Sequence, residues 1–284
     1  MLSLTLGPLA VSVGQALIVL AFLVALVAGK LSARRRNVAI GDAIINLALV
    51  GLVAARLVFV GRYFSSYGLD PLSWIDIRDG GFDLMAGLAA MAAYGGYVGW
   101  RQAAMRRPLC MAAFAGLLAW GLTGGALSLI EHQASRPPQA TLHTLDNKPV
   151  NLADLQQQAG HKPMVVNLWA TWCPPCRKEM PLLEQAQEQR PDLMFVFANQ
   201  GEDGITIRDF MDQMALDMDH VLLDRQGNIG QLAGSAALPT TLFYAADGEL
   251  VDSHLGELSA ATLKEALKPL ETASDPSIST QETP

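Results

Sequence analysis

The hydrophobic positions divide the chain into two halves. Residues 1–130 are dominated by leucine, alanine, valine and glycine, whereas residues 131–284 have the mixed composition of an acidic soluble domain. A helix that crosses a bilayer needs about 20 apolar residues. Four stretches of the first half meet this requirement, at residues 8–28, 38–60, 82–100 and 109–130. The pattern therefore predicts an α-helical transmembrane bundle of four spans, followed by a globular domain.

Charges in the connecting segments predict the orientation of the spans. Lysine and arginine cluster after the first span, at residues 30–36, and after the third, at residues 101–107. The loop between the second and third spans instead carries Asp70, Asp76 and Asp79 against two arginines. Because basic loops remain in the cytoplasm, both chain ends are expected outside it. The first span does not read as a cleaved signal peptide, because its positive cluster follows it and three more spans come after.

Apolar strands and amphipathic helices alternate in the second half. The alternation predicts an α/β domain, a mixed sheet with helices on both faces. Asp247-Gly248 indicates a hairpin turn between its last two strands. We assign residues 1–136 to the membrane domain, 137–272 to the α/β domain and 273–284 to a disordered tail. The expected strands are residues 141–145, 164–170, 193–199, 221–223, 240–245 and 250–254, and the expected helices are 177–189, 205–216, 229–232 and 259–270.

The candidate chemistry lies in the sequence Trp172-Cys173-Pro174-Pro175-Cys176, between a buried strand and a helix. A CxxC motif in that place indicates a redox dithiol. The helix dipole and the unpaired N–H groups of the first turn favour a thiolate at Cys173, the species that attacks disulfides. Cys176 lies one helical turn further on and can resolve the mixed disulfide. The two prolines suit a first turn, where no backbone donor is needed.

Two structural interpretations compete with the redox dithiol. Zinc needs more ligands, and the third cysteine, Cys110, lies far away in an apolar segment. A structural bridge that closes so short a loop would add little stability. Electron carriers that pass a disulfide across the membrane need a pair of membrane cysteines. We therefore interpret Cys110 as a small apolar filler and expect no metal site.

Residues 165–176 resemble the active-site strand and turn of thioredoxin-like proteins, and Leu238-Pro239-Thr240 matches their second landmark. With Pro181, which kinks the active-site helix, the match covers residues 139–270 and is nearest to the TlpA/ResA/DsbE group of membrane-tethered oxidoreductases. The resemblance implies that Pro239 is cis and pairs its backbone with substrate beside Cys173. It also implies that Leu238 contacts the sulfur atoms and that Trp172 shields them.

One position departs from the thioredoxin pattern. Asn167 stands where thioredoxins carry a buried acid that takes the proton of the resolving thiol. An amide cannot do this, so the proton must leave through water or another carboxylate. Glu179 is a candidate by proximity, but we interpret it as a solvated helix residue.

A second resemblance concerns the membrane half. Residues 41–56 and 79–87 are similar to the N-terminal part of prolipoprotein diacylglyceryl transferase. The chain carries Met85-Ala86-Gly87 where that family has a histidine and two glycines, and it lacks the family's later spans. The resemblance implies a related membrane scaffold without transferase activity. Asp42 is interpreted as an interface residue and Arg56 as a side chain that extends to the membrane surface, with a functional role as the alternative.

The leading hypothesis is a protein-disulfide reductase anchored in the bacterial inner membrane, multi-pass, with its catalytic domain in the periplasm. The expected partners are periplasmic protein thiols and disulfides, an external membrane donor of the DsbD/CcdA kind, and the lipid bilayer, but no nucleic acid. No cofactor is expected besides the redox-active Cys173–Cys176 disulfide. The alternatives are a disulfide oxidase or isomerase, a lipid-modifying or lipid-binding protein, and a copper chaperone. Copper ligands could come from Met211, Met214, Met218 and His220, although their spacing fits packing better.

Overall fold

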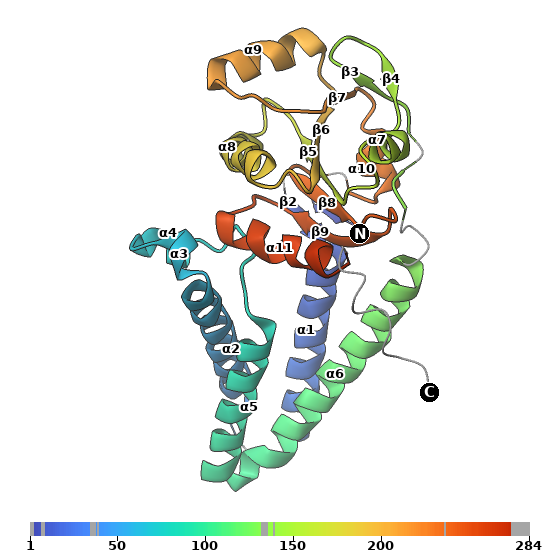
Figure 1. The fold of residues 1–284 in the computed structure, drawn as a ribbon. Coiled ribbons are helices and arrows are strands. Elements are labelled where there is room, and N and C mark those ends of the chain that lie inside the picture. The colour runs from blue at the N-terminus through green and yellow to red at the C-terminus, as the bar shows by residue number, and fades with distance from the viewer. Residues whose placement is uncertain are drawn as a thin grey trace, which may run out of the picture. The chain divides into compact units, whose positions relative to one another are not determined.

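The computed structural model describes residues 3–6, 9–34, 38, 40–131, 136–138, 140–235 and 237–273. The chain divides into a helical unit, Val13–Ile130, and an α/β unit made of Glu131–Pro284 together with Met1–Ser12 (Figure 1). The predicted disordered tail lies outside the described residues, except for Ala273, which ends the last helix.

Four long helices form the described part of the helical unit. They pack closely where α2 and α5 face each other: a Cβ added at Gly87 would lie 3.1 Å from the side chain of Ala55. Glycine therefore lets the two backbones approach. Two short helices lie in the loop between α2 and α5. The helices of this unit are α1 (Val13–Ala33), α2 (Ile40–Arg62), α3 (Phe64–Tyr67), α4 (Pro71–Ile75), α5 (Leu84–Arg101) and α6 (Ala103–Glu131).

Three helices among the described residues are long and apolar enough to cross a membrane, namely Val13–Ala33, Ile40–Arg62 and Ala103–Gly125. The third predicted span corresponds to α5, whose 18 residues include glycines, tyrosines and an arginine that lower its hydropathy. The first helix begins at Val13 rather than at residue 8. The residues before it pair instead as a hairpin of β1 (Ser3–Leu6) and β2 (Leu9–Ser12).

Arg56 is buried, so its interpretation as a side chain that extends to the membrane surface is wrong. Its guanidinium donates to the Asp79 carboxylate at 2.9 Å. The loop after α2 folds back over the helix end and supplies this acceptor. Cys110 is free and exposed on α6, so it does not fill the packing between helices.

A seven-stranded mixed sheet forms the α/β unit, with strand order β4-β3-β7-β6-β5-β8-β9. Strand β5 pairs parallel with β6, and β6 with β7, while the outer pairs are antiparallel. The mixed sheet and the expected long elements are confirmed. The strands are β3 (Leu142–Thr144), β4 (Pro149–Val150), β5 (Met164–Trp169), β6 (Met194–Gln200), β7 (Val221–Asp224), β8 (Thr240–Tyr244) and β9 (Leu250–Leu255).

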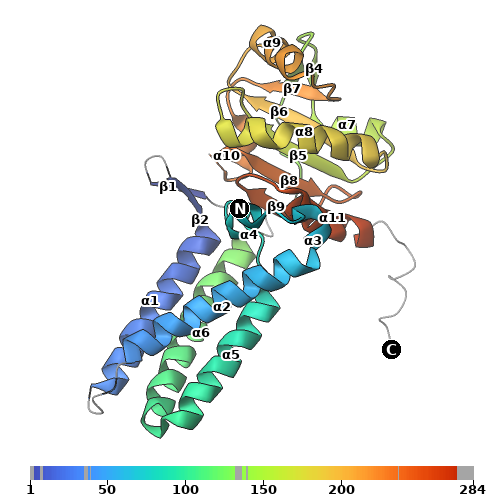
Figure 2. The ribbon, with the colours of Figure 1, turned by 90° about the vertical axis from the view of Figure 1, so that its left-hand side faces the viewer.

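Helices cover both faces of this sheet, as the alternation predicts (Figure 2). One apolar core holds side chains of α8, α9 and α11 against the sheet, and the other holds side chains of α7 and α10. Residues of the central strand β5 are buried along its whole length because both faces are covered. These helices are α7 (Leu152–Gln158), which the sequence did not indicate, α8 (Pro174–Gln189), α9 (Gly204–Met214), α10 (Asn228–Leu232) and α11 (Ala260–Ala273).

Candidate active site

The dithiol lies where β5 ends and α8 begins. Cys173 is the N-cap residue of α8, and its Sγ accepts a hydrogen bond from the Cys176 backbone N–H at 3.3 Å. The two cysteines form a disulfide with an S–S distance of 2.06 Å. Pro174 and Pro175 occupy the first turn, whose N–H groups have no partner within a helix. A thiolate released at Cys173 is therefore stabilised by the N-terminal end of the helix.

Access to the disulfide comes from the side of Cys173. In the disulfide form Cys173 is only 3 % exposed and Cys176 is fully buried. Trp172 beside them is 66 % exposed. A cavity of about 550 Å³ borders Cys173, and its lining includes Trp172, Pro174, Pro175, Arg225, Gln231 and Leu238. The cavity therefore lies on the Cys173 side of the disulfide.

The segment Leu238-Pro239-Thr240 lies next to the cavity. The Leu238–Pro239 peptide bond is cis, as expected. The Pro239 carbonyl accepts a hydrogen bond from the Gly256 N–H at 2.9 Å, and its pairing with substrate stays a prediction. Thr240 is buried and its hydroxyl donates to the Ala237 carbonyl at 2.7 Å.

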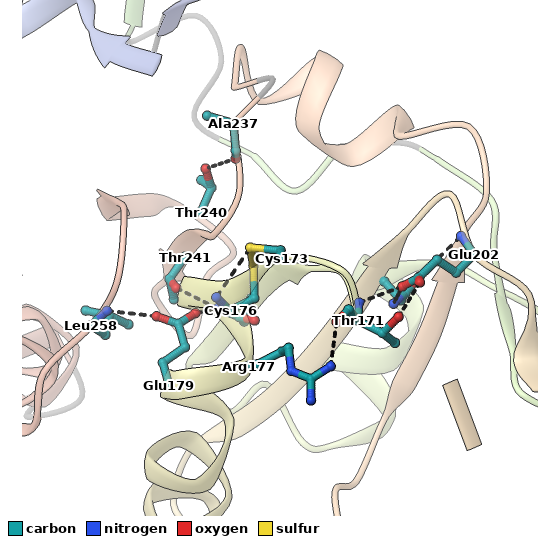
Figure 3. The surroundings of a disulfide bond; sticks show 12 residues. Thr171, Cys173, Cys176, Arg177, Glu179, Glu202, Ala237, Thr240, Thr241 and Leu258 are labelled. Carbon is teal, nitrogen blue, oxygen red and sulfur yellow. Dashed lines mark hydrogen bonds between the residues drawn. A yellow bond between two sulfur atoms is a disulfide. The ribbon is translucent and has the colours of Figure 1, made fainter. Parts of the chain in front are cut away.

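Glu179 lies beneath the disulfide on the buried side of α8 (Figure 3). Its side chain is 1 % exposed, so its interpretation as a solvated helix residue is wrong. One carboxylate oxygen accepts from Asn167 Nδ2 at 2.8 Å, and the other accepts from the Leu258 N–H at 2.7 Å. Asn167 also donates to the Thr241 hydroxyl at 3.0 Å. Three separate parts of the unit thus hold this carboxyl group one helical turn after Cys176.

Burial raises the pKa of Glu179 from 4.5 to about 7. The charged form loses its hydration inside the protein, and the nearby Glu257 carboxylate raises the pKa further. The hydrogen bonds from Leu258 and Asn167 oppose this shift, because they favour the ionised form. Near neutral pH the group exists in both forms, so it can accept a proton and later release it.

Comparison with known proteins gives the same chemistry. The redoxin family matches residues 133–269. The thiol-disulfide oxidoreductase ResA of Halalkalibacterium halodurans is 30 % identical over 131 residues, which cover 45 % of this chain and 70 % of that protein. The thioredoxin-like protein YneN of Bacillus subtilis is 30 % identical over 139 residues, 48 % of this chain and 78 % of that protein. This chain belongs to the redoxin family of thiol-disulfide oxidoreductases.

Solved structures of redoxins cover the same half. A secreted disulfide oxidoreductase of Mycobacterium tuberculosis, homologous to E. coli DsbE, is 28 % identical, with a TM-score of 0.39. The alignment covers 45 % of this chain and 92 % of that one. The residues that the redoxin family matches, 133–269, lie within the α/β unit.

Sequence reasoning missed the burial of Glu179, although a signal was present. The buried positions of α8 in this redoxin are Cys176, Glu179, Met180, Leu183 and Ala186. They recur at intervals of three and four, the spacing of one helix face. Glu179 lies in the middle of that apolar face, so the periodicity places it inside. Its partners on β5 and before α11 could not be read from the helix.

Glu202 is a second residue of the redoxin site that the sequence did not indicate. Its carboxylate accepts from the Thr171 N–H at 2.7 Å and from the Thr171 hydroxyl. It also accepts from Asn199 Nδ2 at 2.7 Å, at the end of β6. The turn that precedes Trp172 is therefore fastened to the neighbouring strand by charge-assisted hydrogen bonds.

The methionines considered as copper ligands pack against the apolar core. Met218 is buried in it, and Met211 and Met214 are partly buried against it. His220 is exposed after them. Packing, the preferred interpretation of their spacing, therefore accounts for the three methionines.

Proposed function

We propose that this redoxin is a membrane-anchored, extracytoplasmic reductase of disulfides in secreted or periplasmic proteins. The observation that carries the proposal is the arrangement around the CPPC motif. Cys173 caps a helix and borders an open cavity, while Cys176 lies buried next to a carboxyl group with a pKa of about 7. An attacking thiolate and a proton acceptor for the resolving thiol are thus assigned to different residues.

The reaction transfers two electrons to the substrate disulfide. The Cys173 thiolate attacks one substrate sulfur, a mixed disulfide forms, and the second substrate sulfur leaves as a thiolate that takes a proton from water. Cys176 then gives its proton to Glu179, and its thiolate attacks Cys173 Sγ. This step breaks the mixed disulfide and releases the substrate sulfur that Cys173 attacked as a thiolate, which also takes a proton from water. The cysteine pair ends oxidised, and the proton on Glu179 leaves when the site opens to solvent.

Re-reduction requires a dithiol donor, for which we infer a membrane protein of the DsbD/CcdA kind. The single cysteine of the helical unit, Cys110, cannot form a disulfide within that unit to carry electrons. We further propose that the helical unit spans the bacterial inner membrane four times, with α5 as the additional span. The apolar helices and the basic connecting segments support this topology. Alkaline phosphatase fused after Ile130 should be active. If a reporter that works only in the cytoplasm is active at this position instead, the orientation is refuted.

The reduction potential of the full chain in detergent micelles tests the direction of the reaction. A reductase should lie near the potential of thioredoxin, about −270 mV, whereas a potential near the roughly −120 mV of DsbA would identify an oxidase. Equilibration with glutathione or dithiothreitol buffers, followed by thiol alkylation, gives this value. An isomerase would instead refold scrambled substrates at an intermediate potential.

A lipid-related role is the second candidate, because residues 41–56 and 79–87 resemble part of prolipoprotein diacylglyceryl transferase. We propose that the helical unit shares that scaffold without the transferase reaction. Membranes that contain a Cys173→Ser variant should therefore transfer no diacylglyceryl group to a lipoprotein precursor. Transfer by this variant would show that the helical unit is an enzyme in its own right.

A further inference from the structure

The loop between α2 and α5 is organised around the buried guanidinium of Arg56. All three nitrogens of this group donate hydrogen bonds to the loop. Besides Asp79 and the Tyr67 hydroxyl (3.3 Å), the acceptors are main-chain carbonyls of α4 and of the segment that follows it. The bonds run from Nε to the Trp74 carbonyl (2.9 Å), from Nη1 to Asp79 Oδ1 (2.9 Å) and the Gly81 carbonyl (2.8 Å), and from Nη2 to the carbonyls of Ser73 (3.1 Å) and Asp76 (2.6 Å).

These bonds fix which side of the loop faces outward. The carbonyls of Ser73 and Trp74 turn toward Arg56, and the side chains of Leu72 and Ile75 point away from it, 78 % and 74 % exposed. Residues three apart share one face of a helix, so these two side chains lie together on α4. Leu69, just before α4, is 83 % exposed. We call the exposed apolar residues of this loop, Phe64, Leu69, Leu72, Ile75 and Ile77, the loop patch.

The loop patch continues the apolar surface of α2. Leu52, Leu57 and Val58 are also exposed on that helix, which has the length and hydropathy of a membrane span. Exposure of so many contiguous apolar side chains to water is unfavourable. The Phe64 and Trp74 rings lie 6.0 Å apart at the same level, and aromatic side chains favour the membrane–water interface.

Charges of the loop limit how deep it can lie. Arg62 pairs with Asp83 at 2.7 Å, and Arg78 pairs with Asp76 at 2.6 Å. Arg62 and Arg78 remain well exposed, so they belong at the headgroups rather than in the hydrocarbon. From this combination we propose that the loop patch binds the lipid interface of the outer leaflet, with Leu72 and Ile75 inserted at the headgroup–acyl boundary. The inference rests on the proposed membrane anchoring of the helical unit.

The fixed conformation of the loop favours this contact with lipid. A flexible loop would lose conformational entropy on lying in the interface, whereas the Arg56 hydrogen bonds have already ordered this one. The helical unit therefore carries a rigid shallow anchor beside its spans. Short amphipathic helices that lie in the interface plane bind through such an apolar face.

Fluorescent labelling of the full chain in phosphatidylethanolamine–phosphatidylglycerol vesicles tests the proposal. The chain has three cysteines, so a cysteine-free background carries Cys110→Ala, Cys173→Ser and Cys176→Ser. A nitrobenzoxadiazole label is then placed at Leu72→Cys or Ile75→Cys. Quenching is measured with aqueous iodide and with lipids that carry a nitroxide near the headgroup or deep in the acyl chain.

Two matched positions calibrate the measurement. Ser65→Cys lies on α3 of the same loop, exposed and outside the loop patch, and Leu57→Cys lies on the apolar surface of α2. Labels at 72 and 75 should be quenched by iodide about fivefold less than the label at 65, because an ion is excluded from the apolar boundary. The shallow nitroxide should quench them more than the deep one.

Three results would overturn the inference, and they separate its parts. If iodide quenches the labels at 72 and 75 as much as the label at 65, while the label at 57 lies in lipid, the loop patch lies in water. The membrane anchoring of the helical unit is then unaffected. Protection from both iodide and nitroxide means that protein covers the loop patch, either a second copy or the α/β unit. A water-exposed label at 57 refutes the membrane anchoring and the loop contact with it.

Discussion

Replacing Glu179 by glutamine tests the proton acceptor of the redoxin site. The substitution keeps the size of the side chain and removes its ability to ionise. Both oxygens of Glu179 accept hydrogen bonds, from Asn167 and from the Leu258 N–H. Glutamine can still accept from Leu258 if Asn167 turns its amide over. In that rotation Asn167 Oδ1, which is buried without a hydrogen bond among the described residues, accepts from the glutamine amide.

The size of the stability effect follows from the pKa of Glu179. A shift from 4.5 to about 7 means that the folded protein binds this proton more tightly than the unfolded chain. The associated stability is therefore complete below pH 4.5 and is lost as the pH rises through about 7. At about 1.36 kcal/mol for each pKa unit, the loss is about 3 kcal/mol. The Glu179→Gln variant does not titrate, so its free energy of unfolding relative to wild type should rise by this amount over the same pH range.

Kinetics report the catalytic part of the same prediction. Resolution of a mixed disulfide should slow by about 10²-fold at neutral pH, the lower range for loss of a general base. Its pH dependence near pH 7 should also disappear. A peptide disulfide mixed with the reduced full chain, quenched with acid and separated by mass, measures the resolution rate. Glu188→Gln on the same helix is the matched control, because Glu188 is exposed. Wild-type resolution rates with an unchanged pH profile in Glu179→Gln would refute the role of Glu179.

Three further changes test the surroundings. Asn167→Asp places a second carboxyl 2.8 Å from the buried glutamate, so unfolding in urea should show lower stability above neutral pH than at acidic pH; a pH-independent difference would contradict this. Glu202→Ala removes the acceptor of Thr171 and should lower the free energy of unfolding by roughly 1–3 kcal/mol, with Glu202→Gln less affected; equal losses would show that hydrogen bonding is not the cause. Cys176→Ser should accumulate substrate adducts on diagonal gels and Cys173→Ser almost none, and the reverse outcome would exchange their roles.

The local parts of the redoxin unit could be predicted from the sequence. The CPPC motif, the helix after it and the long strands depend on nearby residues and hydrophobic periodicity, and the structure places them close to the expected positions. The environment of Glu179 could not be predicted in the same way. Its partner Leu258 lies 79 residues away and reaches the site only through the folded chain. A carboxylate on a helix is usually solvated, so only its place within the apolar face of α8 distinguished it.

The helical unit could also be predicted only in part from the sequence, for a different reason. Hydropathy identifies apolar helices, because span length and composition are local properties. It does not show how a polar loop folds. Arg56 reads as a residue near a helix end, yet its acceptor Asp79 lies 23 residues on. Apart from the Tyr67 hydroxyl, the other acceptors are main-chain carbonyls, which any sequence has. Residue types therefore give little indication of a buried arginine whose acceptors are main-chain carbonyls.

The position of the buried acid explains how this redoxin can work with Asn167 on its central strand. The buried carboxyl group of this chain lies on α8, and the amide on β5 donates to it across 2.8 Å. Burial raises the pKa of Glu179, while the bonds from Asn167 and Leu258 lower it, and the balance lies near 7. Without these donors the carboxyl would stay protonated and could not take the proton of Cys176. Without burial it would stay ionised and hold no proton. In the proposed reaction, the Leu258 N–H and the Asn167 amide thus together hold the pKa of this carboxyl group near 7.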